Sequence, residues 1–195
     1  MEKNRCNWCL GNELYISYHD IEWGVPKTND QELFELLVLE SFQAGLSWLT
    51  ILKKRENFRA AFANFEIEKV ASFTEKEISM LLQNEGIIRH RGKIEASINN
   101  AKAVLQIQKE QTSFSDFLWQ YVDYKPIQNQ FGNMDKLPAH TNISKKLSAD
   151  LKKLGFKFMG PTTTYAFMQS TGLVNDHLTT CFRYAEVQKT NQVFK

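Results

Sequence analysis

Apolar residues recur at helical spacing along most of the chain. One run begins at Leu33, after Asp30, which can cap a helix. Gly45 breaks or kinks this run, and Ser47 can cap the next one. The pattern therefore predicts two consecutive helices joined by a short turn around Gly45.

Further capping signals extend the helical pattern. Thr74 and Glu77 form a capping box, and Ser113 can cap a short helix. Residues 90–108 carry apolar side chains at near-helical spacing, whereas the prolines and glycine of 123–141 are typical of a loop. Because no alternating strand pattern is found, the sequence predicts an all-α fold, organised as a single helical domain over residues 1–195.

Residues 143–172 predict a helical hairpin. Gly155 suits the end of the first helix, and Pro161 suits the first turn of the second. In a helix-hairpin-helix element, backbone N–H groups of such a connector bind a DNA phosphate, and Lys153 and Lys157 would strengthen that contact. The same pattern also fits an ordinary pair of core helices.

Glu40 is the only formal charge between Glu35 and Lys53. Its position relative to Leu33 and Leu36 places the carboxylate on the apolar face of the predicted helix. A buried carboxylate is costly unless a partner compensates for the lost water. The spacing alone leaves two interpretations of Glu40 open, a structural carboxylate with a partner elsewhere in the chain or a group that meets a bound ligand.

Composition narrows the function only slightly. The net charge of +2 does not by itself indicate a nucleic-acid binder, and the basic clusters at 53–55, 89–93 and 152–153 are either DNA contacts or solvated helix faces. No apolar run approaches the roughly 20 residues of a membrane span. Three cysteines and no export signal in residues 1–5 favour the cytoplasm, without membrane association.

Two pairs of potential metal ligands lie near opposite ends of the chain. His177 and Cys181 are spaced i, i+4, as on one face of a helix or its last turn, and Cys6 and Cys9 form a CxxC. A redox role for the CxxC favours a βαβ setting, which the sequence lacks, and buried cysteines can also act as small hydrophobes. The two pairs favour a zinc site that joins the two terminal segments.

Several long motifs of the chain can be taken together: RCNW, LYISYHDIEWGVP, LFELLVLESFQAGLSWLTILKKRENFR, GIIRHRGKI and GFKFMGPTTTYAFMQSTGLVNDH. In these motifs the chain resembles the bacterial DNA-3-methyladenine glycosylase I family. The resemblance runs from about Arg5 to Cys181. It implies a helix-hairpin-helix glycosylase fold, with that element at about 143–172. It also implies a monofunctional N-glycosyl hydrolase that flips 3-methyladenine out of alkylated double-stranded DNA and excises it, leaving an abasic site.

The resemblance assigns roles to individual residues. It implies one structural Zn²⁺ per chain, formed by segments 6–19 and 177–181, and gives Cys9 no role. The implied zinc ligands are Cys6, His19, His177 and Cys181. The implied base-binding residues are Tyr15, Tyr18, Glu40 and Trp48, with Trp8 and Trp23 nearby, and Glu40 is the candidate catalytic residue. The alternative for the aromatic residues is plain core packing, above all for Trp23.

The implied DNA contacts fall at two turns. Gly45 and Leu46 would lie near the DNA, where Leu46 can fill the gap left by the flipped nucleotide or else pack in the core. Gly155, Lys157 and Gly160 would bind a phosphate at the hairpin.

Many relatives in the superfamily carry an Asp after the hairpin that assists departure of the base. The nearest Asp is Asp176, and we expect it to cap a helix or to orient His177. A cationic alkylated base is already a good leaving group, so little acid catalysis is needed. A monomer without an obligate protein partner is expected. Two alternatives are a non-catalytic damage-binding module and a zinc hydrolase, the latter disfavoured by four protein ligands.

Overall fold

The computed structural model describes residues 3–110 and 113–190 and confirms a mostly helical fold. Met1 and Glu2, part of the segment considered for an export signal, lie outside these residues. The described α-helices are α1 (Glu13–Ile21), α2 (Asp30–Gln43), α3 (Trp48–Ala61), α4 (Ile67–Ala71), α5 (Glu75–Gln83), α6 (Arg91–Glu110), α7 (Phe114–Trp119), α8 (Asn142–Lys153), α9 (Pro161–Ser170) and α10 (Phe182–Lys189). No helix within the described ranges is both long and apolar enough to cross a membrane.

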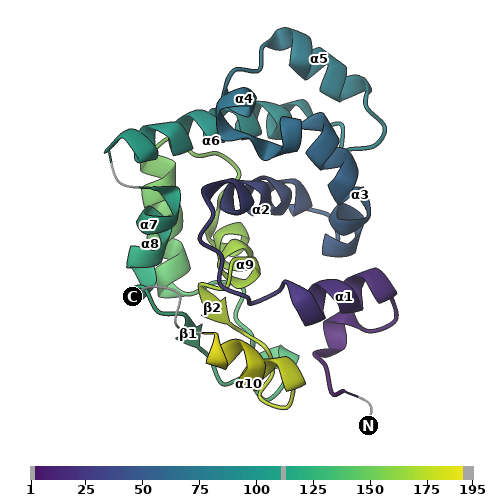
Figure 1. Ribbon diagram of the computed structural model, residues 1–195, viewed down its shortest axis with the longest axis vertical. Coiled ribbons are helices and arrows are strands. Elements are labelled where there is room, and N and C mark those ends of the chain that lie inside the picture. The colour runs from purple at the N-terminus through teal and green to yellow at the C-terminus, as the bar shows by residue number, and fades with distance from the viewer. Residues whose placement is uncertain (1–2, 111–112, 191–195) are drawn as a thin grey trace.

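Helix α2 lies at the centre of the molecule, with α4 and α6 on one side and α9 on the other (Figure 1). Ten of its 14 residues, from Leu33 to Phe42, are buried. A helix surrounded by other elements buries most of its circumference, including positions that carry polar groups. This central position explains why Glu40 is withdrawn from water.

Most predicted caps are confirmed. The side chains of Ser47 and Ser113 accept hydrogen bonds from the first turns of α3 and α7, and Thr74 and Glu77 form the capping box of α5. The prediction for Asp30 was wrong, because the side chain of the preceding residue, Asn29, caps α2.

The Asp30 carboxylate has a tertiary role instead. It accepts hydrogen bonds from the backbone N–H groups of Phe114 and Ser115 at the start of α7, at 2.9 and 2.8 Å. The side chain of Gln108, near the end of α6, donates a third hydrogen bond at 2.6 Å. Asp30 therefore ties the start of α2 to α6 and α7.

The turn after α2 is held by a buried lysine. Gly45 has a φ of +83°, as its predicted helix-ending role requires. Lys93 on α6 is buried, and its ammonium donates to the carbonyls of Phe42 and Ala44 at 2.8 and 2.7 Å. A cation at the C-terminal end of a helix is favourable, so Lys93 fixes the end of the helix that bears Glu40.

Helices α8 and α9 form the predicted αα-hairpin. Gly155 has a φ of +89° after α8, and Pro161 is the first residue of α9. The amide of Asn100, on α6, accepts a hydrogen bond from the Lys157 N–H at 2.8 Å and donates one to the Lys157 carbonyl at 3.0 Å. Helix α6 therefore holds the connector by its backbone.

Residues 123–141 are largely loop, as predicted, apart from a short 3-10 helix (Met134–Lys136) and a two-residue strand. Strand β1 (Ile127–Gln128) pairs in parallel with β2 (Val174–Asn175). Two residues are too few to show an alternating pattern, so no local pattern predicts this pairing. The pairing joins the loop to the segment that follows α9.

Candidate active site and metal centre

A cavity of about 190 Å³ lies beside the central helix. All six residues expected to bind the base line it, namely Trp8, Tyr15, Tyr18, Trp23, Glu40 and Trp48. Five further lining residues were not predicted, namely Gln43, Met134, Leu137, Ala166 and Gln169. The cavity therefore draws on segments from both halves of the sequence, which no local pattern could bring together.

Aromatic rings form much of the cavity wall. The ring centroid of Trp8 lies 4.8 Å from that of Tyr15 and 5.0 Å from that of Trp23, both in edge-to-face arrangements. The ring of Tyr18 lies 5.5 Å from that of Trp48. Tyr15 and Tyr18 are three residues apart on α1 and thus share one face of that helix. The faces of such rings attract cations.

Glu40 brings a titratable group to this wall. The residue is only 4% exposed, and it forms no ion pair within the described part of the chain. Burial raises its carboxyl pKa to about 8, and a hydrogen bond with the Ser170 side chain opposes that shift. Burial also raises the pKa values of Tyr15 and Tyr18, with Glu40 contributing to both, so their hydroxyls stay protonated. A cation bound in the cavity would lower the pKa of the Glu40 carboxyl again and so favour its ionised form.

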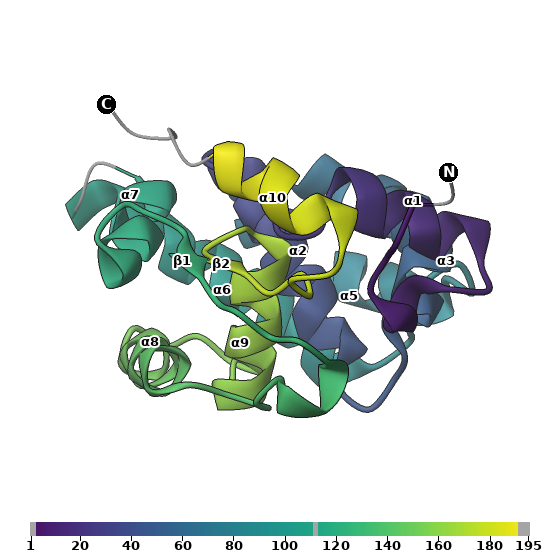
Figure 2. The same cartoon turned by 90° about the horizontal axis from the view of Figure 1, so that it is seen from below.

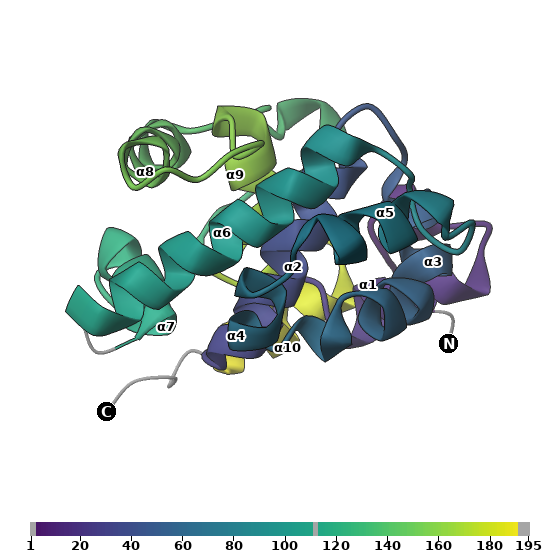
Figure 3. The same ribbon diagram turned by 90° about the horizontal axis from the view of Figure 1, so that it is seen from above.

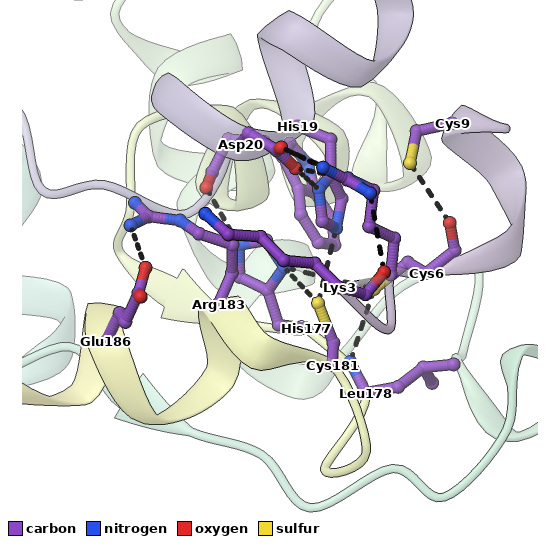
Figure 4. A network of polar contacts seen from close by, with 12 residues as sticks. Lys3, Cys6, Cys9, His19, Asp20, His177, Leu178, Cys181, Arg183 and Glu186 are labelled. Carbon is purple, nitrogen blue, oxygen red and sulfur yellow. Dashed lines mark hydrogen bonds and ion pairs between the residues drawn. The ribbon is translucent and has the colours of Figure 1, made fainter. Parts of the chain in front are cut away.

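A second cluster joins the two ends of the chain (Figure 4). Cys6, His19, His177 and Cys181 are all buried, and their ligand atoms lie within 4.8 Å of one another. The Cys181 Sγ lies 3.5 Å from His19 Nε2 and 3.7 Å from His177 Nδ1, and the Cys6 Sγ lies 3.8 Å from His177 Nδ1. These four residues could hold a metal ion.

The outward-facing nitrogens of both histidines have hydrogen-bond partners. His19 Nδ1 lies 2.8 Å from a carboxylate oxygen of Asp20, which also forms an ion pair with Arg5. His177 Nε2 lies 3.0 Å from the carbonyl oxygen of Trp23. Such contacts orient the ring and fix its tautomer, as around metal-binding histidines.

Three details of this region differ from or refine the sequence analysis. His177 and Cys181 do not lie on a helix, because the chain turns between β2 and α10 and Cys181 is the residue just before α10. Cys9 faces away from the cluster, and its Sγ donates to the Cys6 carbonyl at 3.1 Å (Figure 4). Asp176 was expected to cap a helix or to orient His177, but its carboxylate instead accepts hydrogen bonds from the side chains of Asn129, Tyr165 and Gln169.

The residues expected to contact DNA lie at turns. A Cβ added at Gly45, Gly155 or Gly160 would meet no other atom within 4 Å, and Leu46 is 39% exposed. The turn between α2 and α3 and the N-terminal end of α9 lie along the same edge of the molecule (Figures 2 and 3). Lys157 is exposed, but its backbone N–H is already bonded to Asn100.

Several members of the basic clusters are committed to other contacts. Arg55 forms ion pairs with Glu22 and Glu35, and Arg91 forms ion pairs with Glu75 and Glu95. Lys153, expected to assist the hairpin, forms an ion pair with Asp150 at 2.8 Å. For these side chains the structural interpretation of the clusters is favoured.

The fold is that of DNA glycosylases. A crystal structure of a 3-methyladenine DNA glycosylase I matches with a TM-score of 0.90 and 53% identity, covering 92% of this chain and 98% of that one. The same enzyme from Staphylococcus aureus matches with a TM-score of 0.89 and 43% identity, covering 92% and 96%. A further structure at 43% identity and a TM-score of 0.89, covering the same shares, is a complex with 3-methyladenine.

The chain belongs to the methyladenine glycosylase family, whose model matches residues 8–184. It is 51% identical over 180 residues to DNA-3-methyladenine glycosylase 1 of Escherichia coli, covering 92% of this chain and 96% of that protein. It is 52% identical over 177 residues to a DNA-3-methyladenine glycosylase of Haemophilus influenzae, covering 91% and 96%. The resemblance of the sequence motifs is thereby confirmed.

Proposed function

We propose that this protein is a DNA-3-methyladenine glycosylase acting in base excision repair. It binds alkylated duplex DNA, turns the damaged nucleotide out of the helix and hydrolyses the N-glycosidic bond, leaving an abasic site. A base within a duplex must leave the stack before an enzyme can act on its glycosidic bond. The observation that carries the proposal is a buried carboxylate in an aromatic cavity, in a chain about half identical to two such enzymes.

The cavity suits a cationic base. Alkylation at N3 gives adenine a positive charge within DNA, which the faces of Trp8, Tyr15, Tyr18, Trp23 and Trp48 can stabilise. Glu40 supplies the opposite charge and accepts a hydrogen bond from the exocyclic amine. Because undamaged adenine is neutral, the aromatic faces and the Glu40 carboxylate stabilise it less. Recognition therefore depends on charge as well as shape, and Glu40 acts by electrostatic stabilisation rather than by activating water.

The metal in this proposal is a single structural Zn²⁺. Tetrahedral bonds of about 2.3 Å to sulfur and 2.0–2.1 Å to nitrogen place the two donor atoms about 3.5 Å apart. The nitrogen–sulfur distances of 3.5, 3.7 and 3.8 Å fit that geometry. Since four protein ligands leave no position for a water molecule, the ion would fasten the two chain ends and take no part in hydrolysis.

DNA would bind along the edge formed by the α2–α3 turn and the hairpin. Leu46 is exposed on that turn and would enter the duplex beside the flipped nucleotide. Gly155, Lys157 and Gly160 would lie at a phosphate, which makes 143–172 a helix-hairpin-helix element. Gly160 precedes α9 without any side-chain cap, so the first N–H groups of that helix suit a phosphate oxygen.

The rest of the proposal follows from the same features. Residues 1–195 act as one domain and as a monomer, without an obligate protein partner. The three cysteines are all free and buried, which fits the reducing cytoplasm.

The test is incubation of the protein with methylated duplex DNA, followed by identification of the released bases. We expect free 3-methyladenine and abasic DNA, without strand cleavage. Glu40→Gln should release the base more slowly while keeping its affinity for undamaged DNA. Tight binding to methylated DNA without any released base would instead indicate a damage-binding module.

A further inference from the structure

Gln169 lines the same cavity but belongs to neither the aromatic wall nor the expected base-binding set. It lies on α9, one residue before Ser170, whose side chain forms a hydrogen bond with Glu40. Helix α9 therefore brings Gln169 to the cavity beside the carboxylate. A primary amide in such a position can either donate or accept, so its orientation determines what it recognises.

That orientation is fixed from behind by Asp176. The Gln169 Nε2 donates to Asp176 Oδ2 at 2.7 Å, and the Tyr165 hydroxyl donates to the same oxygen at 2.6 Å. The other oxygen, Oδ1, accepts a hydrogen bond from the side chain of Asn129 at 2.6 Å. Because a carboxylate only accepts hydrogen bonds, a reversed Gln169 amide would place two oxygens in contact. Asp176 therefore holds the NH₂ group of Gln169 toward itself.

The Gln169 Oε1 is consequently left as an acceptor. It receives no hydrogen bond from any residue in 3–110 or 113–190, and it is not among the fully buried polar atoms without a partner. Since Gln169 lines the cavity, a bound base can reach this oxygen. The cavity then contains two acceptors for a cationic base, Gln169 Oε1 and the Glu40 carboxylate in its ionised form.

We propose that Gln169 determines specificity for a purine with an amino group rather than a carbonyl at C6, its Oε1 accepting one amine hydrogen while Glu40 accepts the other. This inference rests on the proposed function. An adenine amine offers two hydrogens, one for each acceptor. A guanine carbonyl in the same place would set its lone pairs against both acceptors and leave them without partners. Sites that hydrogen-bond a specific group discriminate strongly against analogues that lack it.

Asp176 is the positioning residue in this arrangement. It lies behind Gln169, is 1% exposed, and does not line the cavity. Asp176→Asn keeps the size of the side chain but gives it an NH₂ group, which can donate to a reversed Gln169 amide. Gln169 could then present its own NH₂ group to the cavity, where it would suit a guanine carbonyl.

The experiment compares single-turnover excision of 3-methyladenine with that of 3-methylguanine and 7-methylguanine from the same methylated duplex. For Gln169→Leu we expect excision of 3-methyladenine to fall about 10- to 100-fold, the discrimination of a good hydrogen-bonded base contact. Excision of the methylguanines should not fall, so the ratio of the 3-methyladenine excision rate to the methylguanine excision rate drops. Asp176→Asn should lower the same ratio by raising methylguanine excision, at unchanged metal content.

Tyr165→Phe is the matched control, because it removes a hydrogen bond to Asp176 Oδ2 and leaves the Gln169 amide in place. It should keep the wild-type ratio. Gln169→Met replaces Gln169→Leu if the latter does not fold, as judged by melting temperature. A wild-type ratio in the folded Gln169 variant would overturn the inference while leaving the proposed function intact. Failure of the wild-type protein to release 3-methyladenine would instead overturn the proposed function.

Discussion

The ionisation of Glu40 gives a pH dependence with a defined sign. Burial raises the pKa of this carboxyl to about 8, so the free protein at pH 7 holds it mostly protonated. A 3-methyladenine nucleotide in DNA carries its positive charge throughout this range and favours the ionised form. The ionised fraction rises from about 1% at pH 6 to about half at pH 8, so kcat/KM should rise about 50-fold between these values.

Single-turnover excision at a DNA concentration well below saturation measures this profile. Glu40→Gln should excise slowly at every pH between 6 and 8, because its amide has no proton to lose. Ser170→Ala should move the wild-type rise to higher pH, since the Ser170 hydrogen bond opposes the shift in Glu40. A flat wild-type profile, or a rise that persists in Glu40→Gln, would refute the assignment.

The same pKa makes a stability prediction. The unfolded chain loses the Glu40 proton near pH 4.5, whereas the folded protein keeps it until about pH 8. Between these values the unfolded state binds fewer protons, so the free energy of unfolding falls as pH rises. The free energy of unfolding of Glu40→Gln should therefore rise relative to that of the wild type as pH increases. The difference should grow by about 1.4 kcal/mol per pH unit across this window, which amounts to a few kcal/mol in all. Urea unfolding at pH 5 and pH 8 measures the difference.

Three further predictions concern the metal ligands, the hairpin and the end of α2. Metal analysis should find about one zinc per chain in the wild type and in Cys9→Ser but none in His177→Ala. The melting temperature of His177→Ala should also be lower than that of the wild type. Stoichiometric zinc in His177→Ala would contradict the ligand set. Lys157→Ala should reduce the salt slope of DNA binding by about one, and an unchanged slope would make Lys157 an ordinary surface residue. Lys93→Met should lower the free energy of unfolding by about 2 kcal/mol because two carbonyls lose a charged donor, whereas Lys102→Met on the exposed face of α6 should not.

Free-base binding separates recognition from catalysis at Glu40. Isothermal titration of Glu40→Gln with 3-methyladenine should show affinity weakened by about 1–3 kcal/mol, the scale of a charge-assisted hydrogen bond. Unchanged base affinity together with lost excision would make Glu40 a general base. Affinity for undamaged DNA serves as the control and should stay near the wild-type value.

Local features of this chain could be predicted because their causes are local. Ser47, Thr74 and Ser113 cap helices with hydrogen bonds to residues two or three positions away, and Gly45 and Gly155 adopt the positive φ angles that end helices. These choices depend on neighbouring residues alone, so the order of helices follows from them. The types of candidate ligand and the isolated charge of Glu40 were likewise visible in the sequence.

Only the tertiary structure decided which groups far apart in the chain become partners. Asp30 has every feature of a cap, yet its carboxylate binds the start of α7, and Asp176 holds the Gln169 amide rather than His177. Met134 lies in a segment that reads as a connector, but the fold brings it to the cavity. A hydrogen bond or packed contact across many residues depends on where whole helices lie, which no local spacing of residues specifies.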